Sequence, residues 1–213
     1  MKCTALLFAL LSTVAAQAGE STSTKFTADD WADGAPPKEV FVVDGTIQVT
    51  TQEGNKVLTV LPDPITDASA QLGVSAAGEA SIQAKVLGTK RGRSSPKFGV
   101  AVHGMSGHRL LLNAPKRQLE LVKNDEVLTS VPFTWTSGAW VWLKLEAKRG
   151  EGEAWLITGK AWSAEATEPV EAQLKHADQG LKGQGKASLW GTPYSEQPIH
   201  FDDIEIRVET AAK

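Results

Sequence analysis

The stretch Glu79-Ala-Ser-Ile-Gln-Ala-Lys-Val86 alternates polar and apolar residues at every step. Its apolar set is Ala80, Ile82, Ala84 and Val86. Successive side chains of a β-strand point to opposite faces, so one face of this segment is apolar and the other is polar. The pattern therefore predicts a strand of an antiparallel sheet with one face buried and one face in water.

The same period of two recurs along the rest of the chain. It predicts strands at Val40–Val43, Thr46–Thr50, Val57–Leu61, Gln71–Ser75, Phe98–His103, Arg109–Asn113, Gln118–Val122, Val127–Val131, Ala139–Ala147, Ala154–Gly159, Val170–Lys175, Lys186–Trp190 and His200–Val208. Turn signals such as Asp44-Gly45 separate them. Many short strands at this spacing favour an all-β, two-sheet antiparallel sandwich. We expect at most one or two short helices, one of them within Asp63–Ala70.

The first eighteen residues have the features of a secretory signal peptide. Lys2 is followed by the apolar run Ala5–Ala16, and Ala16-Gln17-Ala18 has the small residues typical of a cleavage site. The run is too short to span a bilayer. We therefore expect a secreted or periplasmic protein, with a signal peptide at 1–18 and a single sandwich domain at 19–213.

Composition excludes several classes of function. The net charge is −3, which argues against a nucleic-acid-binding protein, because such proteins need a basic excess. The only cysteine is Cys3, which would leave with the signal peptide. The remaining chain could then form neither a disulfide nor a cysteine metal site.

Two motifs near the end of the chain carry a resemblance to a known family. Gly185-Lys-Ala-Ser-Leu-Trp-Gly191 is followed by Phe201-Asp-Asp-Ile-Glu-Ile206. With Phe26–Trp31 near the start, they resemble the concanavalin A-like, laminin-G-like jelly-roll domains of secreted bacterial proteins. The resemblance implies a jelly-roll sandwich. That superfamily includes lectins, glycosidases and lyases, so the fold alone does not fix the function.

The sequence offers few candidates for catalytic residues. Asp203, Glu205 and Glu209 alternate near the C-terminus, but this pattern is more typical of the solvent face of a strand. Glu120 is a single acid between two leucines, which we interpret as a surface position. Gly104–His108 departs from the G-x-S-x-G nucleophile motif and is better explained as a turn. We therefore expect a non-catalytic protein.

Aromatic residues suggest where a ligand would bind. The chain has seven tryptophans and one tyrosine, and sugars stack their C–H faces on such rings. Three aromatic residues lie near loops and are our candidates for stacking: Trp162, Trp190 and Tyr194. Three residues at strand ends are candidates for hydrogen-bond donors: His103, His108 and Arg109.

Two other features suggest charged ligands. Asp30, Asp202 and Asp203 would meet if the chain ends adjoin, and could then contribute to a structural calcium site. Turn-forming or exposed aspartates are the simpler explanation of these residues. The segment Gly88–Lys97 is a basic loop, in which Lys90, Arg91 and Arg93 could meet an acidic polymer or simply be solvated.

Three functions remain open. The favoured one is an exported, non-catalytic domain that binds carbohydrate or a glycoconjugate. The second is a glycoside or sugar hydrolase of the same architecture, which would need paired carboxylates in a cleft. The third is a structural or protein-binding subunit of the cell envelope, which would need a broad exposed apolar patch.

Overall fold

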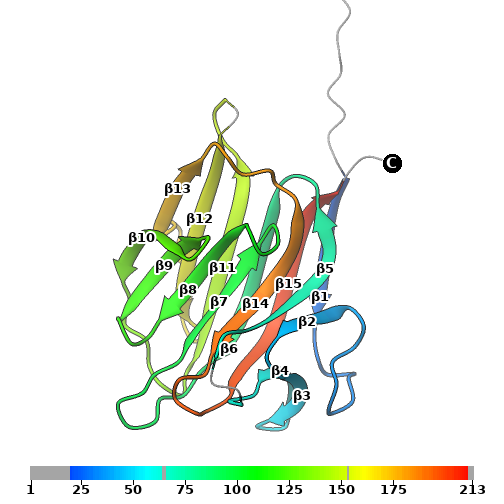
Figure 1. Ribbon diagram of the computed structural model, residues 1–213, viewed down its shortest axis with the longest axis vertical. Coiled ribbons are helices and arrows are strands. Elements are labelled where there is room, and N and C mark those ends of the chain that lie inside the picture. Colours follow the sequence, from blue (N-terminus) through cyan, green and yellow to red (C-terminus); the bar gives the residue numbers. More distant parts are fainter. Residues whose placement is uncertain (1–19, 64–65, 153, 211–213) are drawn as a thin grey trace, which may run out of the picture.

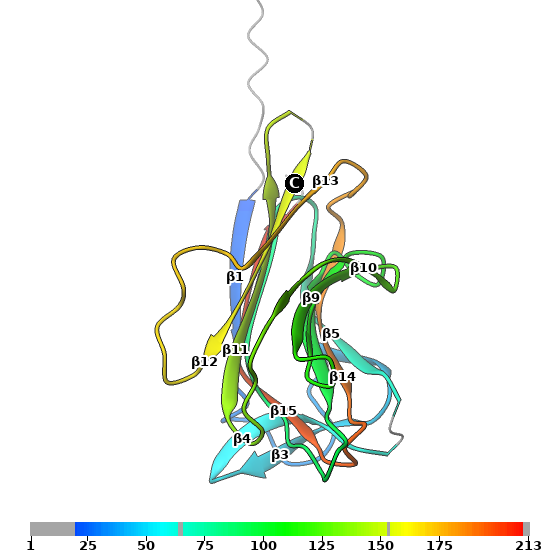
Figure 2. The same ribbon diagram turned by 90° about the vertical axis from the view of Figure 1, so that its left-hand side faces the viewer.

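The computed structural model describes residues 20–63, 66–152 and 154–210, which form two antiparallel sheets packed face to face (Figures 1 and 2). The first sheet runs in the order β13-β12-β11-β6-β15-β4-β3, and β1 pairs with β15. Its strands are β1 (Glu20–Phe26), β3 (Ile47–Gln52), β4 (Asn55–Val60), β6 (Ala80–Leu87), β11 (Trp140–Arg149), β12 (Trp155–Ser163), β13 (Leu174–Asp178) and β15 (Ile199–Thr210).

The second sheet has seven strands in the order β10-β9-β8-β7-β14-β5-β2. They are β2 (Val40–Asp44), β5 (Ala68–Ala76), β7 (Lys97–Val102), β8 (His108–Asn113), β9 (Gln118–Lys123), β10 (Glu126–Pro132) and β14 (Gly185–Thr192). The predicted two-sheet antiparallel sandwich is therefore confirmed. The described residues contain no helix, and hence none that could cross a membrane.

The core lies between the sheets, where period-two alternation places one face of each strand. In β6 the predicted apolar set is buried: Ala80, Ile82, Ala84 and Val86. The neighbouring strand β11 buries Val141, Leu143, Leu145 and Ala147, so Trp140 and Trp142 lie on its outer face. From the second sheet, β7, β8, β9 and β14 contribute a matching set: Phe98, Val100, Leu110, Leu112, Leu119, Leu121 and Leu189.

Two local predictions differ from the structure, and one strand was not predicted. The described residues of the expected helix at Asp63–Ala70 contain none, since Asp63, Thr66 and Asp67 are irregular and Ala68–Ala70 already belongs to β5; residues 64 and 65 lie outside the described part of the chain. The strand expected at Val170–Lys175 begins only at Leu174, and Val170 is an exposed loop residue. We did not predict β1, because its sequence ESTSTKF is polar; it pairs along β15 and buries only Phe26.

The outer face of the seven-stranded sheet collects side chains from four adjacent strands in one row. Trp190 of β14 pairs with Gly99 of β7, which pairs with Leu111 of β8 and then with Glu120 of β9. Arg109 lies two residues before Leu111 and therefore shares this face. The register thus brings an aromatic ring, a guanidinium and a carboxylate to one outer surface of the sandwich.

Candidate functional site

A groove of about 230 Å³ lies on this outer face. Strands β7, β8, β9, β10 and β14 line its floor, and Tyr194 reaches it from the β14–β15 connection. Its polar and aromatic lining is Asp67, Lys97, Arg109, Asn113, Lys116, Glu120, Asp125, Trp190, Thr192 and Tyr194. The groove therefore combines aromatic rings with hydrogen-bonding groups of several kinds, as ligand sites commonly do.

Both aromatic rings of the groove are paired with cations. The guanidinium carbon of Arg109 lies 4.2 Å from the ring centroid of Trp190. The Lys97 ammonium lies 5.2 Å from the ring centroid of Tyr194, whose side chain is exposed. Such contacts hold a flexible cation in place over the ring face. Arg109 is also paired with Asp125, which lies in the exposed turn between β9 and β10.

The expectation that Glu120 is a surface residue is wrong. The residue is only 2% exposed, and Asn113 Nδ2 donates to both of its carboxylate oxygens at 3.1 Å. Lys116 Nζ lies 3.4 Å from the same carboxylate. Glu120 is thus a buried, hydrogen-bonded carboxylate in the groove floor, where it fixes the Asn113 amide.

The structure brings together three of the six residues that we predicted to bind ligand, namely Arg109, Trp190 and Tyr194. Trp162 lies instead on the outer face of the eight-stranded sheet. Its ring stacks on Trp142 with centroids 6.0 Å apart, and only 9% of the residue is exposed. Trp162 is therefore separated from the groove by the whole sandwich.

His103 and His108 are buried at one end of the sandwich and do not line the groove. His108 is 0% exposed, and its Nε2 lies 3.1 Å from Asp178 Oδ2. Burial lowers the pKa of His108 to about 4, although the Asp178 carboxylate acts in the opposite direction. His103 Nε2 contacts the carbonyl of Gly78 at 2.8 Å, and burial lowers its pKa too. Both residues are therefore neutral parts of the interior at pH 7.

The three aspartates of the predicted calcium site do not form a cluster. Among the residues that the structure describes, no group of three or more His, Cys, Asp or Glu side chains could hold a metal ion. The Asp202 carboxylate accepts hydrogen bonds from Asn55 Nδ2 and from the Asp203 backbone N–H, both at 2.8 Å. Asp203 faces Lys85 Nζ at 3.7 Å, and Asp30 lies in the exposed β1–β2 connection.

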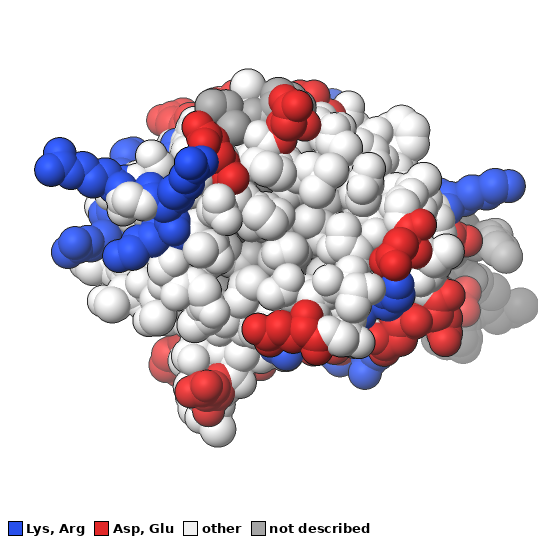
Figure 3. All heavy atoms as spheres, turned by 90° about the horizontal axis from the view of Figure 1, so that it is seen from below, with Lys and Arg blue, Asp and Glu red and all other residues white. Residues whose placement is uncertain are grey.

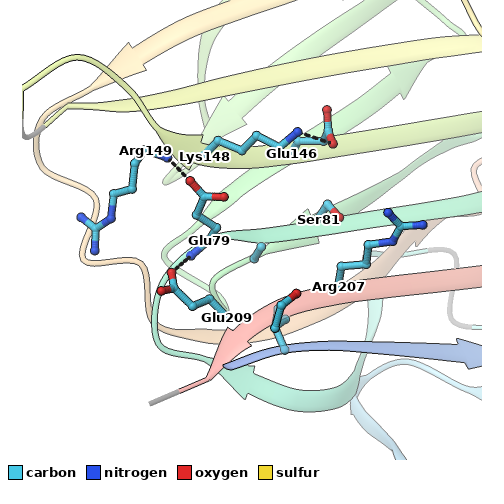
Figure 4. A pocket seen from close by; sticks show the side chains of 10 residues that line it. Glu79, Ser81, Glu146, Lys148, Arg149, Arg207 and Glu209 are labelled. Atoms are coloured by element: carbon cyan, nitrogen blue, oxygen red, sulfur yellow. Dashed lines mark hydrogen bonds and ion pairs between the residues drawn. The ribbon is translucent and has the colours of Figure 1, made fainter. Parts of the chain in front are cut away.

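The eight-stranded sheet carries two other hollows. One, of about 450 Å³, gathers charged side chains from β11 and β15 and from Glu79, which directly precedes β6 (Figure 4). There Glu146 pairs with Lys148, while Glu79 accepts a hydrogen bond from the Arg149 backbone N–H at 2.7 Å. Glu79, Glu146 and Lys148 are thus already engaged by other groups of the protein. The other, of about 690 Å³, lies beside Trp140, whose ring faces Lys85 Nζ at 5.3 Å.

Comparison with known proteins confirms the fold. No protein-family model and no curated protein sequence matches the chain. Among solved structures, a Lotus tetragonolobus seed lectin matches with a TM-score of 0.57 at 7% identity, covering 90% of this chain and 100% of the lectin. The carbohydrate-binding module CBM66 from Bacillus subtilis matches with a TM-score of 0.55 at 13% identity, covering 78% of this chain and 94% of the module. The carbohydrate recognition domain of Emp46p, in its metal-free form, matches with a TM-score of 0.54 at 10% identity, covering 82% and 89%. The chain therefore shares the jelly-roll sandwich fold of these proteins, which is the fold that its terminal motifs suggested.

Proposed function

We propose that this protein is an exported, non-catalytic domain that binds carbohydrate in the groove on its seven-stranded sheet. The observation that carries the proposal is the convergence of Trp190 and Tyr194 with Asn113, Arg109 and Thr192 on one outer face. Sugar rings need flat apolar surfaces for their C–H faces and polar groups for their hydroxyls. Similarity of fold to lectins and to a carbohydrate-binding module supports the same class of ligand.

Each side chain has a distinct role in this proposal. The exposed Tyr194 ring would stack on one sugar unit, and the edge of Trp190 would contact the next. The Nε1 of Trp190 is buried and makes no hydrogen bond within the described protein, so this ring would offer a ligand apolar contact rather than a donor. The Asn113 amide is held in position by the buried Glu120 carboxylate. Preorganised polar groups of this kind reduce the entropy lost on binding.

The test is a screen of the folded protein against a broad glycan array, followed by affinity electrophoresis with polysaccharides that score. Trp190→Ala and Tyr194→Ala should each weaken binding by about tenfold or more, because each removes a stacking surface. Trp140→Ala is the matched control, because this tryptophan too has a cation over its ring, that of Lys85, but lies on the opposite sheet.

Two results would count against the proposal. If Trp140→Ala abolishes binding and Trp190→Ala does not, glycan binds on the other sheet. If the folded protein binds no glycan on the array, contact with another envelope protein becomes the favoured function.

A further inference from the structure

Each aromatic ring in the groove has a cation over one of its faces. Arg109 lies over Trp190 at 4.2 Å, and Lys97 lies over Tyr194 at 5.2 Å. A ligand that contacts either ring therefore has a guanidinium or an ammonium beside it. This arrangement favours a ligand that carries negative charge along with its apolar ring faces.

The carboxylates of the groove are already engaged by groups of the protein itself. The Asp67 carboxylate accepts a hydrogen bond from the Thr192 hydroxyl. Glu120 is buried under Asn113 and Lys116, while Asp125 lies on an exposed turn and pairs with Arg109. A second anion would therefore compete only with Asp125 for Arg109, because the other two acids make no contact with this guanidinium.

The basic surface continues beyond the groove. A neighbouring hollow shares Lys97, Asn113, Lys116 and Tyr194 with the groove and adds Arg93 from the 88–97 loop. A third hollow continues it to Lys90 and Arg117. Seen from below, a group of Lys and Arg side chains projects at the left, the side on which the 88–97 loop lies in Figure 1, while other basic side chains lie toward the right and lower edges (Figure 3).

Charge on this continuous surface is opposite to that of the whole chain. Its lining has six basic residues, Lys90, Arg93, Lys97, Arg109, Lys116 and Arg117, and three acidic ones, Asp67, Glu120 and Asp125. The whole chain has a net charge of −3. Within the described residues, Arg93 and Arg117 are exposed and lie in no ion pair. The positive charge is thus local, and two of its guanidinium groups are unneutralised.

We propose that the ligand of this groove is an anionic polysaccharide, whose carboxylate or sulfate groups bind the row of cations from Arg109 through Lys97 to Arg93 and Arg117. The inference rests on the proposed carbohydrate-binding function and names its ligand class. Guanidinium groups match the planar oxygens of carboxylates and the tetrahedral oxygens of sulfates with two parallel hydrogen bonds. The sugar rings between the charged groups would contact the flanks of Trp190 and Tyr194.

The experiment compares polymers that differ only in charge. Dextran sulfate is measured against dextran, and polygalacturonate against its methyl ester, by calorimetry and affinity electrophoresis at low and at high NaCl concentration. We expect binding to one or both anionic members, little binding to the neutral members, and weakening at high salt because exposed charges are screened. The two pairs also distinguish a sulfated from a carboxylated ligand.

Variants locate the interaction. Arg93→Gln combined with Arg117→Gln should weaken binding of the anionic polymer about fivefold to tenfold, since two exposed cations are removed. Lys25→Gln combined with Lys175→Gln removes the same charge from β1 and β13 of the other sheet and should leave binding unchanged. Trp190→Ala should weaken binding as well, which a purely electrostatic attraction would not predict.

The outcomes separate this inference from the function on which it rests. Binding to neutral glycans that depends on Trp190 but not on Arg93 and Arg117 would keep the carbohydrate-binding function and overturn the anionic ligand. Equal weakening by both double variants, or equal affinity for duplex DNA of matched charge, would show non-specific attraction to polyanions and overturn the inference. Binding to neither anionic polymer would overturn the inference, and binding to no glycan on the array would overturn the carbohydrate-binding function as well.

Discussion

Acidification should destabilise the fold through His108, because its imidazole is fully buried as the neutral form. The groups that face it are Asp178, at 3.1 Å from Nε2, and the side chains of Lys123, His176 and His103. Burial lowers the pKa of His108 from 6.5 to about 4; the Asp178 carboxylate raises the pKa, while the three other groups lower it.

The sign and size of the effect follow from proton linkage. Between pH 6.5 and about pH 4 the unfolded chain binds a proton at this imidazole and the folded protein does not. The stability that His108 contributes is therefore complete above pH 6.5 and is lost as the pH falls through this window. Each pKa unit corresponds to about 1.36 kcal/mol, so the total loss is roughly 3 kcal/mol, and most of it is complete by pH 4.5.

The assay is urea denaturation of the wild type and of His108→Gln at pH 7.5 and at pH 4.5. The wild type should lose roughly 2–3 kcal/mol more than the variant between these two pH values. Burial also lowers the pKa of His103 and of His200, and both residues are present in the wild type and in the variant. The two proteins therefore share that part of the pH dependence, and only the difference in stability between them reports on His108. Asp178 does not confuse the result: burial acts to raise its pKa, but hydrogen bonds from Lys123 and the Gly180 amide outweigh this and hold the pKa below 3.8. Identical pH dependence in the two proteins would refute the reasoning.

Three further predictions concern other parts of the chain. Gly159→Ala should destabilise the fold by about 1–3 kcal/mol in thermal or urea denaturation, because a Cβ there would lie 2.6 Å from Leu110 Cδ1 between the sheets. Glu120→Ala should cost about 1–3 kcal/mol by the same measurement, since the buried Asn113 amide loses its acceptor; a cost near zero would show that this hydrogen bond is unimportant. Expression in a secreting bacterial host should give a mature protein that begins directly after Ala18, which N-terminal sequencing can check and an uncleaved chain would contradict.

The fold was largely predictable because a period of two is a local property of each strand. The alternation of β6 predicted its buried face correctly, and the turn residues predicted most of the strand boundaries. The polar β1 was missed because its pairing with β15, far along the chain, holds it in place rather than an apolar face of its own. No local pattern reports such a pairing.

The candidate site was predictable only in part, because alternation shows which side chains share a face but not what covers that face. His108 has the same parity as Leu110 and Leu112, which was a signal that it points into the core. Glu120 shows the opposite case. The alternation of its strand places it on the outer face, yet Asn113 and the other side chains around the groove cover it. That burial depends on neighbouring strands.

The most direct test of the central claim is the affinity of the folded protein for a polysaccharide that it retains, compared between the wild type, Trp190→Ala and Trp140→Ala. We predict that Trp190→Ala loses about tenfold or more in affinity and that Trp140→Ala binds as the wild type does. Equal affinity in all three proteins, or loss only in Trp140→Ala, would contradict a glycan site in the groove of the seven-stranded sheet.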